Sequence, residues 1–477
     1  MTSLSALSPL APLLREDIER LDTHLPTVNV LSLNGPGQSG GVPTSLEPVV
    51  QKLGTKVNWF AFSNLPDGDF DPKSDLSKKA FTYHRPNAPK LLEDDHRRIA
   101  QNYLSPLLHG FAEKARFEPE AWKSFRALGE TAAAECLAVG CNSFPTLVWI
   151  HDYQLVLASK PLASNAGIVL CQFWHVPWPR AEQIERALIG RELTEALLYN
   201  RLVGFHTVQY AENFLATVRK IFPTAVIDDK EMTVTMNGRT TQITVMPLGI
   251  DLPYWQNLAR SARPIADALA SSYGLASQII LGVDKLEFSK GILERLDGLE
   301  QFCLDYPAMR RRFHYVQISQ VVPDGNSQLQ DYTKAVEEKI ASINSSFGEN
   351  GWKPILHIKG NLAQRQLAAW YQAADVLSVN SIADGLNLIA KEYVASRLDE
   401  QGVLVLSKNA GAAQELAQGA ILVDPCDQNA LSAAFYNALT LGAEEKRKRN
   451  LSMRHVLSWN QLHNWALGFL NRAIKSR

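Results

Sequence analysis

The sequence is poor in cysteine, has no excess of charge of either sign and contains no long apolar run. Its 48 Lys and Arg residues almost balance 49 Asp and Glu residues, which leaves a formal charge of -1. Such a balance provides neither a basic surface for nucleic acid nor an acidic tail. No apolar run approaches the roughly 18 residues of a membrane span, and Met1–Asp17 has no basic stretch before an apolar core. The sequence therefore predicts a cytoplasmic protein with no nucleic-acid or membrane partner.

The five cysteines are odd in number and scattered, which argues against a disulfide framework. They are Cys136, Cys141, Cys171, Cys303 and Cys426. A zinc site at Cys136 and Cys141 would need a second pair or a nearby histidine, and the sequence has neither. We therefore expect reduced, mostly buried thiols and no zinc site at these cysteines.

What the chain does contain is enough apolar sequence for two cores. Hydrophobic residues make up 46% of its 477 residues, a length that suits two domains of roughly 200 to 250 residues. Short β-rich runs alternate with helical patterns in two series. The first series is Val28–Leu33, Lys56–Phe62, Leu147–His151, Gly167–Trp174, Leu202–His206 and Gln242–Met246. The second is Gln278–Val283, Tyr315–Ser319, Ile355–Ile358, Val376–Val379, Val403–Leu406 and Ala420–Val423. This alternation predicts an α/β protein with two doubly wound parallel sheets.

Proline and glycine interrupt this pattern at Pro247–Asp251, where we place the boundary between the domains. The predicted domains are residues 1–248 and 249–456, followed by an amphipathic tail, 457–477, that packs back on the first domain. Ligands of doubly wound sheets bind beyond the carboxyl ends of the strands. The expected site is therefore the cleft between the two domains.

The most informative segment is Ala383–Tyr393, where an apolar strand gives way to an acid, a glycine and a helix. The first turn of that helix would present free N–H groups and the positive end of its dipole to an anion. Asp384 would accept hydrogen bonds from hydroxyls, and Glu392, about two turns further on, suits a ribose diol better than a phosphate, which it would repel. These features favour a nucleotide sugar. In the competing interpretation Asp384 merely caps the helix and Glu392 lies on a solvated face.

A glycine-rich loop, Asn34–Thr44, follows the first predicted strand. Its glycines permit close approach of the backbone to a ligand, and its later part is suited to begin a helix. The spacing matches neither the dinucleotide pattern G-x-G-x-x-G nor a P-loop, so NAD and P-loop nucleotides are not favoured. A tight surface turn explains the loop nearly as well.

Two predicted strands end in histidine, at His151 and at His175. With Asp152 and the flanking tryptophans, these strand ends are suited to bind sugar hydroxyls and apolar ring faces. A single histidine at the end of a strand is more often a hydrogen-bonded structural residue. The pair also raises the possibility of a metal, but no third ligand accompanies it at a suitable spacing.

Two lysines, Lys285 and Lys290, follow the first strand of the second series, within Gly282–Gly291. Transfer from a nucleotide diphosphate leaves negative charge on the departing oxygen, and a fixed cation stabilises that charge most in the transition state. Lys290, beside a glycine, is the better candidate. The alternative is a solvated lysine pair, the commonest situation of lysine.

Together these motifs resemble trehalose-6-phosphate synthases and the related glucosylglycerol-phosphate synthases. The likeness runs in order from about residue 28 to residue 470. The motifs that carry it are His151–Tyr153, Phe173–Pro179, Gly282–Gly291, Ala383–Tyr393 and Asn409–Leu416. The resemblance implies a GT-B fold of two Rossmann-like domains, the first binding the acceptor and the second the nucleotide sugar. It also implies metal-independent, retaining transfer of glucose from UDP- or ADP-glucose to a small phosphorylated acceptor. The nucleotide sugar is then a substrate, and no cofactor or metal is expected.

By position, the resemblance implies that Lys290 binds the donor diphosphate. Lys285 would stand where the family usually has arginine, which keeps the charge but loses bidentate phosphate binding. Glu392 would bind the ribose. The donor glucose and diphosphate would be held by Asp384, Gly385, Leu386, Asn387 and Leu388.

The resemblance also implies that Asp152 touches the acceptor and that His175 lies near the donor glucose. The predicted acceptor site further includes Asn34, Gly40, Gly41, His96, Arg97 and Arg98. Front-face retention in the family uses no protein nucleophile, because the donor phosphate oxygen takes the proton of the acceptor. Catalysis would then consist of positioning and leaving-group stabilisation by the predicted catalytic residues, Lys290, Lys285, His175 and Asp152.

The chain departs from the family on the acceptor side. Where the family usually has an arginine just after the first strand, this chain reads Leu33-Asn34-Gly35. A tryptophan expected before Pro-Leu is Ser105. A second arginine is replaced near Asp324–Asn326. The basic segment His96–Arg98 would restore the missing charge, or would form the solvated face of a helix.

Four functions therefore compete. The first is a glucosyltransferase that makes an osmolyte precursor from a small phosphorylated polyol or an altered sugar phosphate, and the second is trehalose-6-phosphate synthesis itself. The third is a pseudo-glycosyltransferase that joins an aminocyclitol through a C–N bond. The fourth is an inactive regulator that binds a nucleotide sugar. The choice between UDP and ADP, and whether the chain forms a homo-oligomer, stay open.

Overall fold

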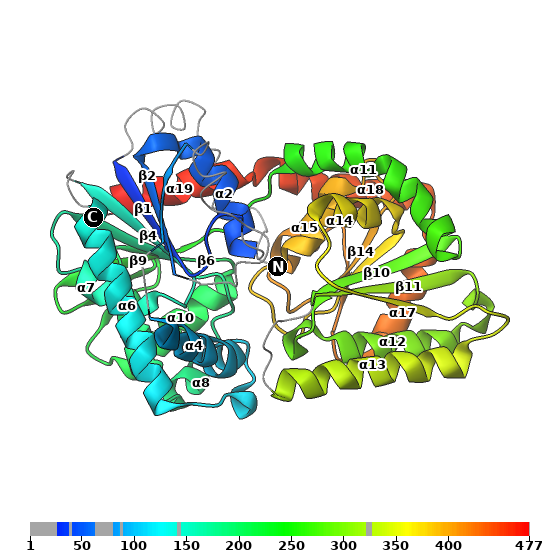
Figure 1. Ribbon diagram of the computed structural model, residues 1–477, viewed down its shortest axis with the longest axis horizontal. Helices are drawn as coiled ribbons and strands as arrows, with labels where there is room; N and C mark the ends of the chain where they lie inside the picture. The colour runs from blue at the N-terminus through cyan, green and yellow to red at the C-terminus, as the bar shows by residue number, and fades with distance from the viewer. Residues whose placement is uncertain are drawn as a thin grey trace. The chain divides into compact units, whose positions relative to one another are not determined.

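The computed structural model describes residues 26–37, 41–62, 80–85, 89–140, 145–320 and 327–476. The chain forms two compact units, one made of residues 1–248 with 462–477 and the other of residues 249–461 (Figure 1). The passage between the units at Leu248 and Gly249 lies within the proline- and glycine-containing segment 247–251. The return at Leu462 comes a few residues later than the tail expected from the sequence.

The described part of the first unit contains a nine-stranded sheet with the order β3-β2-β1-β4-β5-β6-β9-β8-β7. Its strands are β1 (Thr27–Ser32), β2 (Val57–Ala61), β3 (Thr82–His84), β4 (Thr146–His151), β5 (Ile168–Phe173), β6 (Leu202–Phe205), β7 (Val226–Asp228), β8 (Thr233–Met236) and β9 (Arg239–Val245). All six strand runs predicted here are confirmed. The expectation of a purely parallel sheet is wrong, because β7, β8 and β9 pair antiparallel. Asn237 and Gly238, both at positive φ, form the tight turn between β8 and β9, a hairpin signal that is readable in the sequence.

Helices cover both faces of this sheet. They are α2 (Gly41–Leu53), α4 (Lys90–Ile99), α5 (Ser105–Leu108), α6 (Pro119–Gly140), α7 (Ser159–Leu162), α8 (Ala181–Arg186), α9 (Gly190–Leu197), α10 (Val208–Ile221) and α19 (Leu462–Lys475). Local sequence sets some of their bounds: Thr207 caps α10 by accepting a hydrogen bond from the amide of Tyr210. A π-helical turn, Ala100–Leu104, joins α4 to α5.

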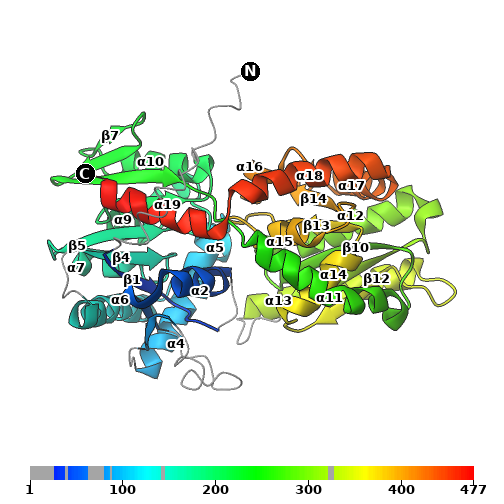
Figure 2. The same ribbon diagram turned by 90° about the horizontal axis from the view of Figure 1, so that it is seen from above.

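The helix α19 returns from the second unit to the first and lies against its sheet (Figures 1 and 2). Trp465 is its main anchor. The indole packs against Trp149 and Phe173, at ring-centroid distances of 5.6 and 4.8 Å, and its N–H donates to the carbonyl of Met246 at 3.1 Å.

The second unit contains a six-stranded parallel sheet with the order β12-β11-β10-β13-β14-β15 in its described residues. The strands are β10 (Gln278–Lys285), β11 (Phe313–Gln320), β12 (Ile355–Lys359), β13 (Val376–Val379), β14 (Val403–Ser407) and β15 (Ile421–Val423). All six predicted strand runs are confirmed. The strand order reverses between β10 and β13, which makes their carboxyl ends the switch point where doubly wound sheets bind ligands.

Each face of the second sheet packs on its own apolar cluster. The helices α11 (Leu252–Tyr273), α14 (Gln364–Ala373), α15 (Leu388–Ser396) and α18 (Ala443–Trp459) cover one face, and α12 (Ile292–Asp305), α13 (Ser327–Phe347) and α17 (Gln428–Thr440) cover the other (Figure 1). A short helix, α16 (Ala413–Leu416), follows β14. None of the helices described is both long and apolar enough to cross a membrane.

The cysteines within the described residues are unpaired. Cys136, Cys171 and Cys303 are buried and Cys426 is exposed. Cys141 lies outside the described residues.

Replacing Trp465 by alanine should lower the free energy of unfolding of the first unit by about 3 to 5 kcal/mol, because a large buried side chain is lost. Trp459, 60% exposed on α18, is the matched control, and its replacement by alanine should change stability by less than about 1 kcal/mol. Urea denaturation followed by circular dichroism measures both. Equal effects would show that α19 does not depend on the Trp465 anchor.

Candidate active site

The residues singled out in the second unit meet where β10 and β13 end. The turn Phe288–Lys290 follows β10, and the loop before α15 follows β13. Hydrogen bonds join the two segments: the amide of Ile382 donates to Ser289 O at 2.8 Å, and Asn380 Nδ2 donates to Gly291 O at 3.1 Å. Gly291 has φ 63°, and a Cβ at this position would lie 2.2 Å from Asn380 O. Only glycine permits this close approach.

The centre of this arrangement is an ion pair between Lys290 and Asp384. Lys290 Nζ lies 2.7 Å from Asp384 Oδ2, and the two side chains are 18% and 11% exposed. The same carboxylate accepts hydrogen bonds from Ser381 Oγ and Asn387 Nδ2, each at 3.1 Å. Burial acts to lower the pKa of Lys290, but nearby carboxylates, Asp384 foremost, outweigh it and raise the pKa. Lys290 is therefore a fixed cation at neutral pH.

The helix α15 begins beside this pair. Asn387, at φ 76°, is its N-cap and accepts a hydrogen bond from the amide of Ala390 at 3.1 Å. The alternative in which Asp384 caps the helix is therefore wrong, because that carboxylate is occupied by Lys290 and its neighbours. The amides of the first turn, including that of Leu388, have no intrahelical acceptor and suit an anion.

A neighbouring loop holds the Asp384 segment in place. The amide of Gly411 donates to Asp384 O at 3.1 Å, and that of Ala412 donates to Leu386 O at 2.7 Å. A Cβ on Gly411 would lie 2.0 Å from Gly385 O. Glycine is therefore required for the two loops to pack this closely.

Glu392 lies further along α15 and is half-buried. Its Oε2 accepts a hydrogen bond from the hydroxyl of Tyr371 at 2.8 Å. Burial raises the pKa of Glu392 to about 7, although the Tyr371 hydroxyl acts in the opposite direction. The solvated helix face considered as an alternative is thus wrong for Glu392. Sequence reasoning missed Tyr371, which stands on a helix with no motif around it.

Lys285 is placed differently from Lys290. It is the last residue of β10, its side chain is exposed, and no ion pair joins it to another of the described residues. Its predicted contact with a diphosphate stays a prediction.

A buried ion pair that sequence reasoning also missed lies beneath the Lys290 turn. Arg295, on α12, and Asp284, on β10, approach to 2.6 Å with side-chain exposures of 0% and 2%. A charged residue on the apolar face of this helix, next to Ile292 and Leu296, is the signal in the sequence that marks it.

In the first unit, the strand ends of β4 and β5 bring Asp152 and His175 together. Asp152 has φ 62°, a left-handed conformation that is strained for a non-glycine residue. Its Oδ1 accepts a hydrogen bond from the amide of His175 at 3.2 Å, and its Oδ2 accepts one from Gln154 Nε2 at 3.3 Å. Burial raises the pKa of Asp152 to about 6, which these hydrogen bonds only partly offset.

His151 and His175 contact one another directly, with His151 Nδ1 3.0 Å from His175 Nε2. Burial lowers the pKa of both and takes that of His175 to about 3, so the pair is uncharged at neutral pH. The described residues contain no group of three or more His, Cys, Asp or Glu side chains arranged to hold a metal ion. The prediction that the flanking tryptophans bind sugar is wrong, because Trp149, Trp174 and Trp178 have no exposed surface.

The basic segment His96–Arg98 lies on α4. His96 is buried, its Nε2 is 2.7 Å from Gln154 O, and burial lowers its pKa to about 4. An uncharged His96 cannot replace a lost phosphate-binding cation, so that part of the prediction is wrong. Arg98 is balanced by Asp95 at 2.6 Å and Glu118 at 3.4 Å, and Arg97 lies 3.8 Å from Asp94.

The remaining predicted acceptor residues lie near the first strand. Asn34 is half-buried, and its carbonyl accepts a hydrogen bond from Ser32 Oγ at 2.7 Å. Gly41 begins α2, as the glycine-rich loop predicted. Gly40 and the segment Asp324–Asn326 lie outside the described residues.

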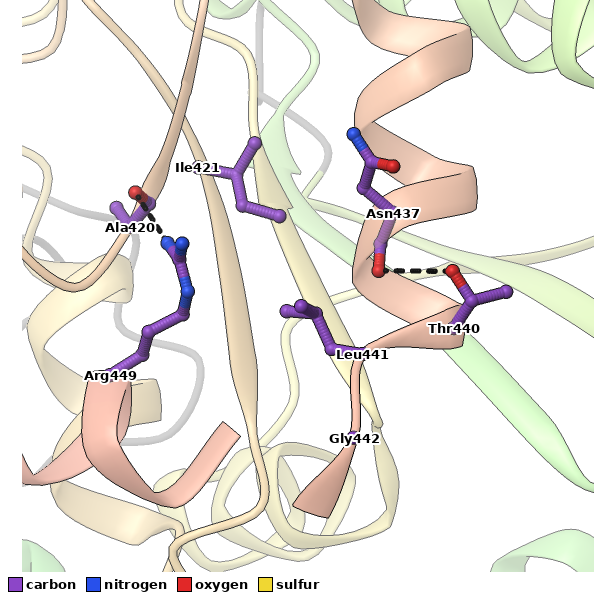
Figure 3. A pocket seen from close by; sticks show the side chains of 7 residues that line it. All are labelled: Ala420, Ile421, Asn437, Thr440, Leu441, Gly442 and Arg449. Carbon is purple, nitrogen blue, oxygen red and sulfur yellow. Dashed lines mark hydrogen bonds between the residues drawn. The ribbon is translucent and has the colours of Figure 1, made fainter. Parts of the chain in front are cut away.

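A pocket of about 530 Å³ lies elsewhere in the second unit (Figure 3). It is lined by Ala420, Ile421, Asn437, Thr440, Leu441, Gly442 and Arg449. Ala420 and Ile421 stand at the start of β15, so this pocket lies at the amino-terminal ends of the parallel strands, whereas Lys290 follows the carboxyl end of β10. Its one ionisable side chain, Arg449, is already paired with Glu445 at 2.7 Å. It offers no acid, base or free cation for the transfer.

Comparison with known proteins identifies the family. The model of glycosyltransferase family 20 matches residues 29–475. The chain belongs to this family. The bifunctional trehalose-6-phosphate synthase/phosphatase of Thermoproteus tenax is 32% identical over 386 residues, which are 80% of this chain. The chain spans only 51% of that relative. A trehalose-6-phosphate synthase of Mycobacterium avium is 29% identical over 92% of this chain and 90% of its own length.

Solved structures agree with this assignment. A trehalose-phosphate synthase from Burkholderia xenovorans, in complex with glucose-6-phosphate, matches with a TM-score of 0.86 and 26% identity over 94% of this chain and 100% of its own. The E. coli protein bound with UDP-2-fluoro glucose gives a TM-score of 0.84 and 26% identity over 94% of this chain and 99% of its own. The predicted GT-B fold and membership in a family of retaining glycosyltransferases are confirmed, and so is the prediction of a nucleotide-sugar-dependent hexosyltransferase, at the level of the family.

Replacing Gly291 by alanine should destabilise the second unit by about 2 to 4 kcal/mol, because the new Cβ clashes with Asn380 O in a left-handed conformation. Gly274 is the matched control. It has φ 61° but no atom within 4 Å of a Cβ, so alanine should cost about 1 kcal/mol there. Thermal unfolding compares the two variants, and equal losses would mean that the turn can move away from Asn380.

Proposed function

We propose that this protein transfers glucose from UDP-glucose to glucose 6-phosphate or a similar small phosphorylated acceptor, with retention at the anomeric carbon. The observation that carries the proposal is the Lys290–Asp384 pair beside the N-terminus of α15, with Glu392 on the same helix. Those groups provide a cation, unpaired amides and a carboxylate, which match the diphosphate, sugar and ribose of one donor molecule.

The donor phosphates would lie between Lys290 and the first turn of α15. Lys290 stays protonated because carboxylates raise its pKa. As the bond between the anomeric carbon and the phosphate oxygen breaks, negative charge grows on that oxygen, and the ammonium stabilises it more than it stabilises the bound donor.

The transfer needs no covalent enzyme intermediate. The acceptor oxygen bonds to the anomeric carbon on the face that the diphosphate leaves, and the acceptor proton passes to the departing phosphate oxygen. The products are a glucosylated acceptor and a nucleoside diphosphate. On the acceptor side we assign Asp152 to a hydroxyl, because its carboxylate lies at the end of β4 and its backbone holds a left-handed conformation that is strained for a non-glycine residue.

UDP is favoured over ADP as the donor nucleotide because relatives of this chain are named as UDP-forming, including one from Candida albicans that is 29% identical over 86% of the chain. Glucose 6-phosphate is favoured as the acceptor because a similar structure contains it. Glycerol 3-phosphate, as in the glucosylglycerol-phosphate synthases, is the alternative acceptor to test.

Replacing Lys290 by alanine should lower kcat by roughly 100- to 1000-fold, as expected for loss of a charge that stabilises the leaving group. The assay is mass-spectrometric detection of product, with UDP- or ADP-glucose offered to glucose 6-phosphate, glycerol 3-phosphate, glucose and glycerol separately. Lys334→Ala is the control, because Lys334 is 76% exposed on α13 and pairs only loosely with Glu338.

Unchanged transfer by Lys290→Ala would overturn the assignment of the leaving-group contact. If the wild-type protein binds the nucleotide sugar but glucosylates no acceptor, the pseudo-glycosyltransferase or the inactive regulator replaces the proposal. A C–N linked product with an aminocyclitol acceptor would identify the former.

Binding of UDP-glucose should weaken as the pH falls below about 7. Burial raises the pKa of Glu392 from 4.5 to about 7, and a ribose diol that donates to its carboxylate binds the ionised form. Below that pKa the group must lose a proton on binding, so the dissociation constant should rise up to about tenfold per pH unit, and above it the curve should be flat. Calorimetry from pH 5.5 to 8.5 measures the slope, and Glu392→Gln should abolish it. A slope that survives in this variant would exclude Glu392 as its source.

A further inference from the structure

The buried pair Arg295–Asp284 has a position in the fold that stability alone does not explain. Arg295 lies on α12, one turn after Gly291, with no exposed side-chain surface. Burying two charges costs free energy that their attraction often fails to recover, and apolar residues of similar size are frequently as stable. A charged pair in this core therefore calls for a role that apolar side chains would not perform.

The guanidinium of Arg295 joins three separate segments. Nη2 lies 2.6 Å from Asp284 Oδ2 near the end of β10, and Nη1 donates to Ser378 O on β13 at 2.9 Å. Nη2 also lies 3.5 Å from the carbonyl of Lys290. A planar group with donors in fixed directions can hold all three, whereas lysine or an apolar side chain cannot.

The surrounding sequence makes room for this group. A Cβ on Gly282 would lie 2.4 Å from Arg295 Nη1 and 2.3 Å from the hydroxyl of Tyr315. Gln317 donates from Nε2 to Asp284 Oδ2 at 3.4 Å and accepts a hydrogen bond from the Tyr315 hydroxyl. Asp284 Oδ2 thus accepts hydrogen bonds from both Arg295 and Gln317.

We propose that Arg295, held by Asp284, is a positioning residue for Lys290. It joins the Lys290 turn to the ends of β10 and β13, so that the ammonium is fixed where charge develops on the departing phosphate oxygen. This inference rests on the proposed transfer from a nucleotide sugar, and it assigns Arg295 no contact with substrate. Its effect should fall on kcat rather than on KM for the donor, because the amides of α15 would still bind the diphosphate while the cation is misplaced.

The test replaces the whole pair, since removing Arg295 alone would leave a buried, unpaired carboxylate. The double variant Asp284→Leu with Arg295→Met should fold and unfold near the wild-type midpoint. Its kcat should fall about 10- to 100-fold, at a nearly unchanged KM for UDP-glucose, as for a misplacement of about 1 Å. The triple variant, in which Lys290→Ala is added to this pair, should have nearly the same kcat as Lys290→Ala alone, because Arg295 acts only through Lys290.

A matched control exists in the same unit. Arg397 is also buried, with 5% side-chain exposure, pairs with Asp399 at 2.8 Å and donates to the carbonyl of Gln372 at 3.0 Å. It lies at the end of α15 remote from its N-terminus and does not contact the Lys290 turn. Asp399→Leu with Arg397→Met should leave kcat unchanged even if stability falls.

Hydrogen exchange provides a readout that does not depend on transfer. The amide of Ile382, which donates to Ser289 O, should lose protection in the Asp284/Arg295 double variant while amides of β11 keep theirs. Three results would each overturn the inference: retained protection at Ile382, a wild-type kcat in the double variant, or a loss of kcat in the triple variant that equals the sum of the separate losses.

Absence of transfer by the wild-type protein would instead refute the proposed function, and the exchange result would still decide the role of Arg295. If the double variant fails to fold, kcat and the exchange of the Ile382 amide are measured in Arg295→Lys instead. We expect a partial loss of kcat and a partial loss of protection in that variant.

Discussion

The arrangement of the candidate site in the second unit depends on a cation and a carboxylate that are held together where water has little access. Lys290 and Asp384 come from loops 94 residues apart, and they meet because β10 and β13 are parallel neighbours that end at the same edge of the sheet. The backbone must come very close to achieve this, which explains glycine at positions 291 and 411. A charge that is already partnered and oriented before the substrate arrives costs little reorganisation during reaction.

In the first unit, burial has the opposite effect on the charge of the polar groups at the strand ends. Lys290 is kept charged by its neighbours, whereas burial keeps His151 and His175 neutral. The first unit thus places two neutral imidazoles next to the carboxylate of Asp152, whose backbone has a left-handed conformation. Two units of similar topology thus present different chemistry because the side chains at their strand ends differ in solvation and in charge partners.

Local pattern was enough to place the twelve predicted strands and the site segment Ala383–Tyr393, because strand runs of branched and aromatic residues and helix starts depend on neighbours in sequence. The antiparallel β7–β8–β9 extension escaped notice although Asn237–Gly238 signals a hairpin. The competing interpretation in which Asp384 caps α15 is also wrong. Asn387 caps it, and Asp384 is occupied by a lysine that no short-range rule connects to it.

By itself, the sequence determined the class of fold, the alternation of elements and the family, and it predicted which residues bind the donor, since these follow from periodicity and from motifs contiguous in the chain. Only the tertiary structure decided which of those groups are charged and which are paired. Burial lowers the pKa of His96, which leaves it neutral, and raises the pKa of Glu392. The packing of the chain leaves Lys285 exposed and places Arg295 beneath the Lys290 turn. Solvation and long-range contacts set these properties, and both arise only when segments far apart in the chain pack together.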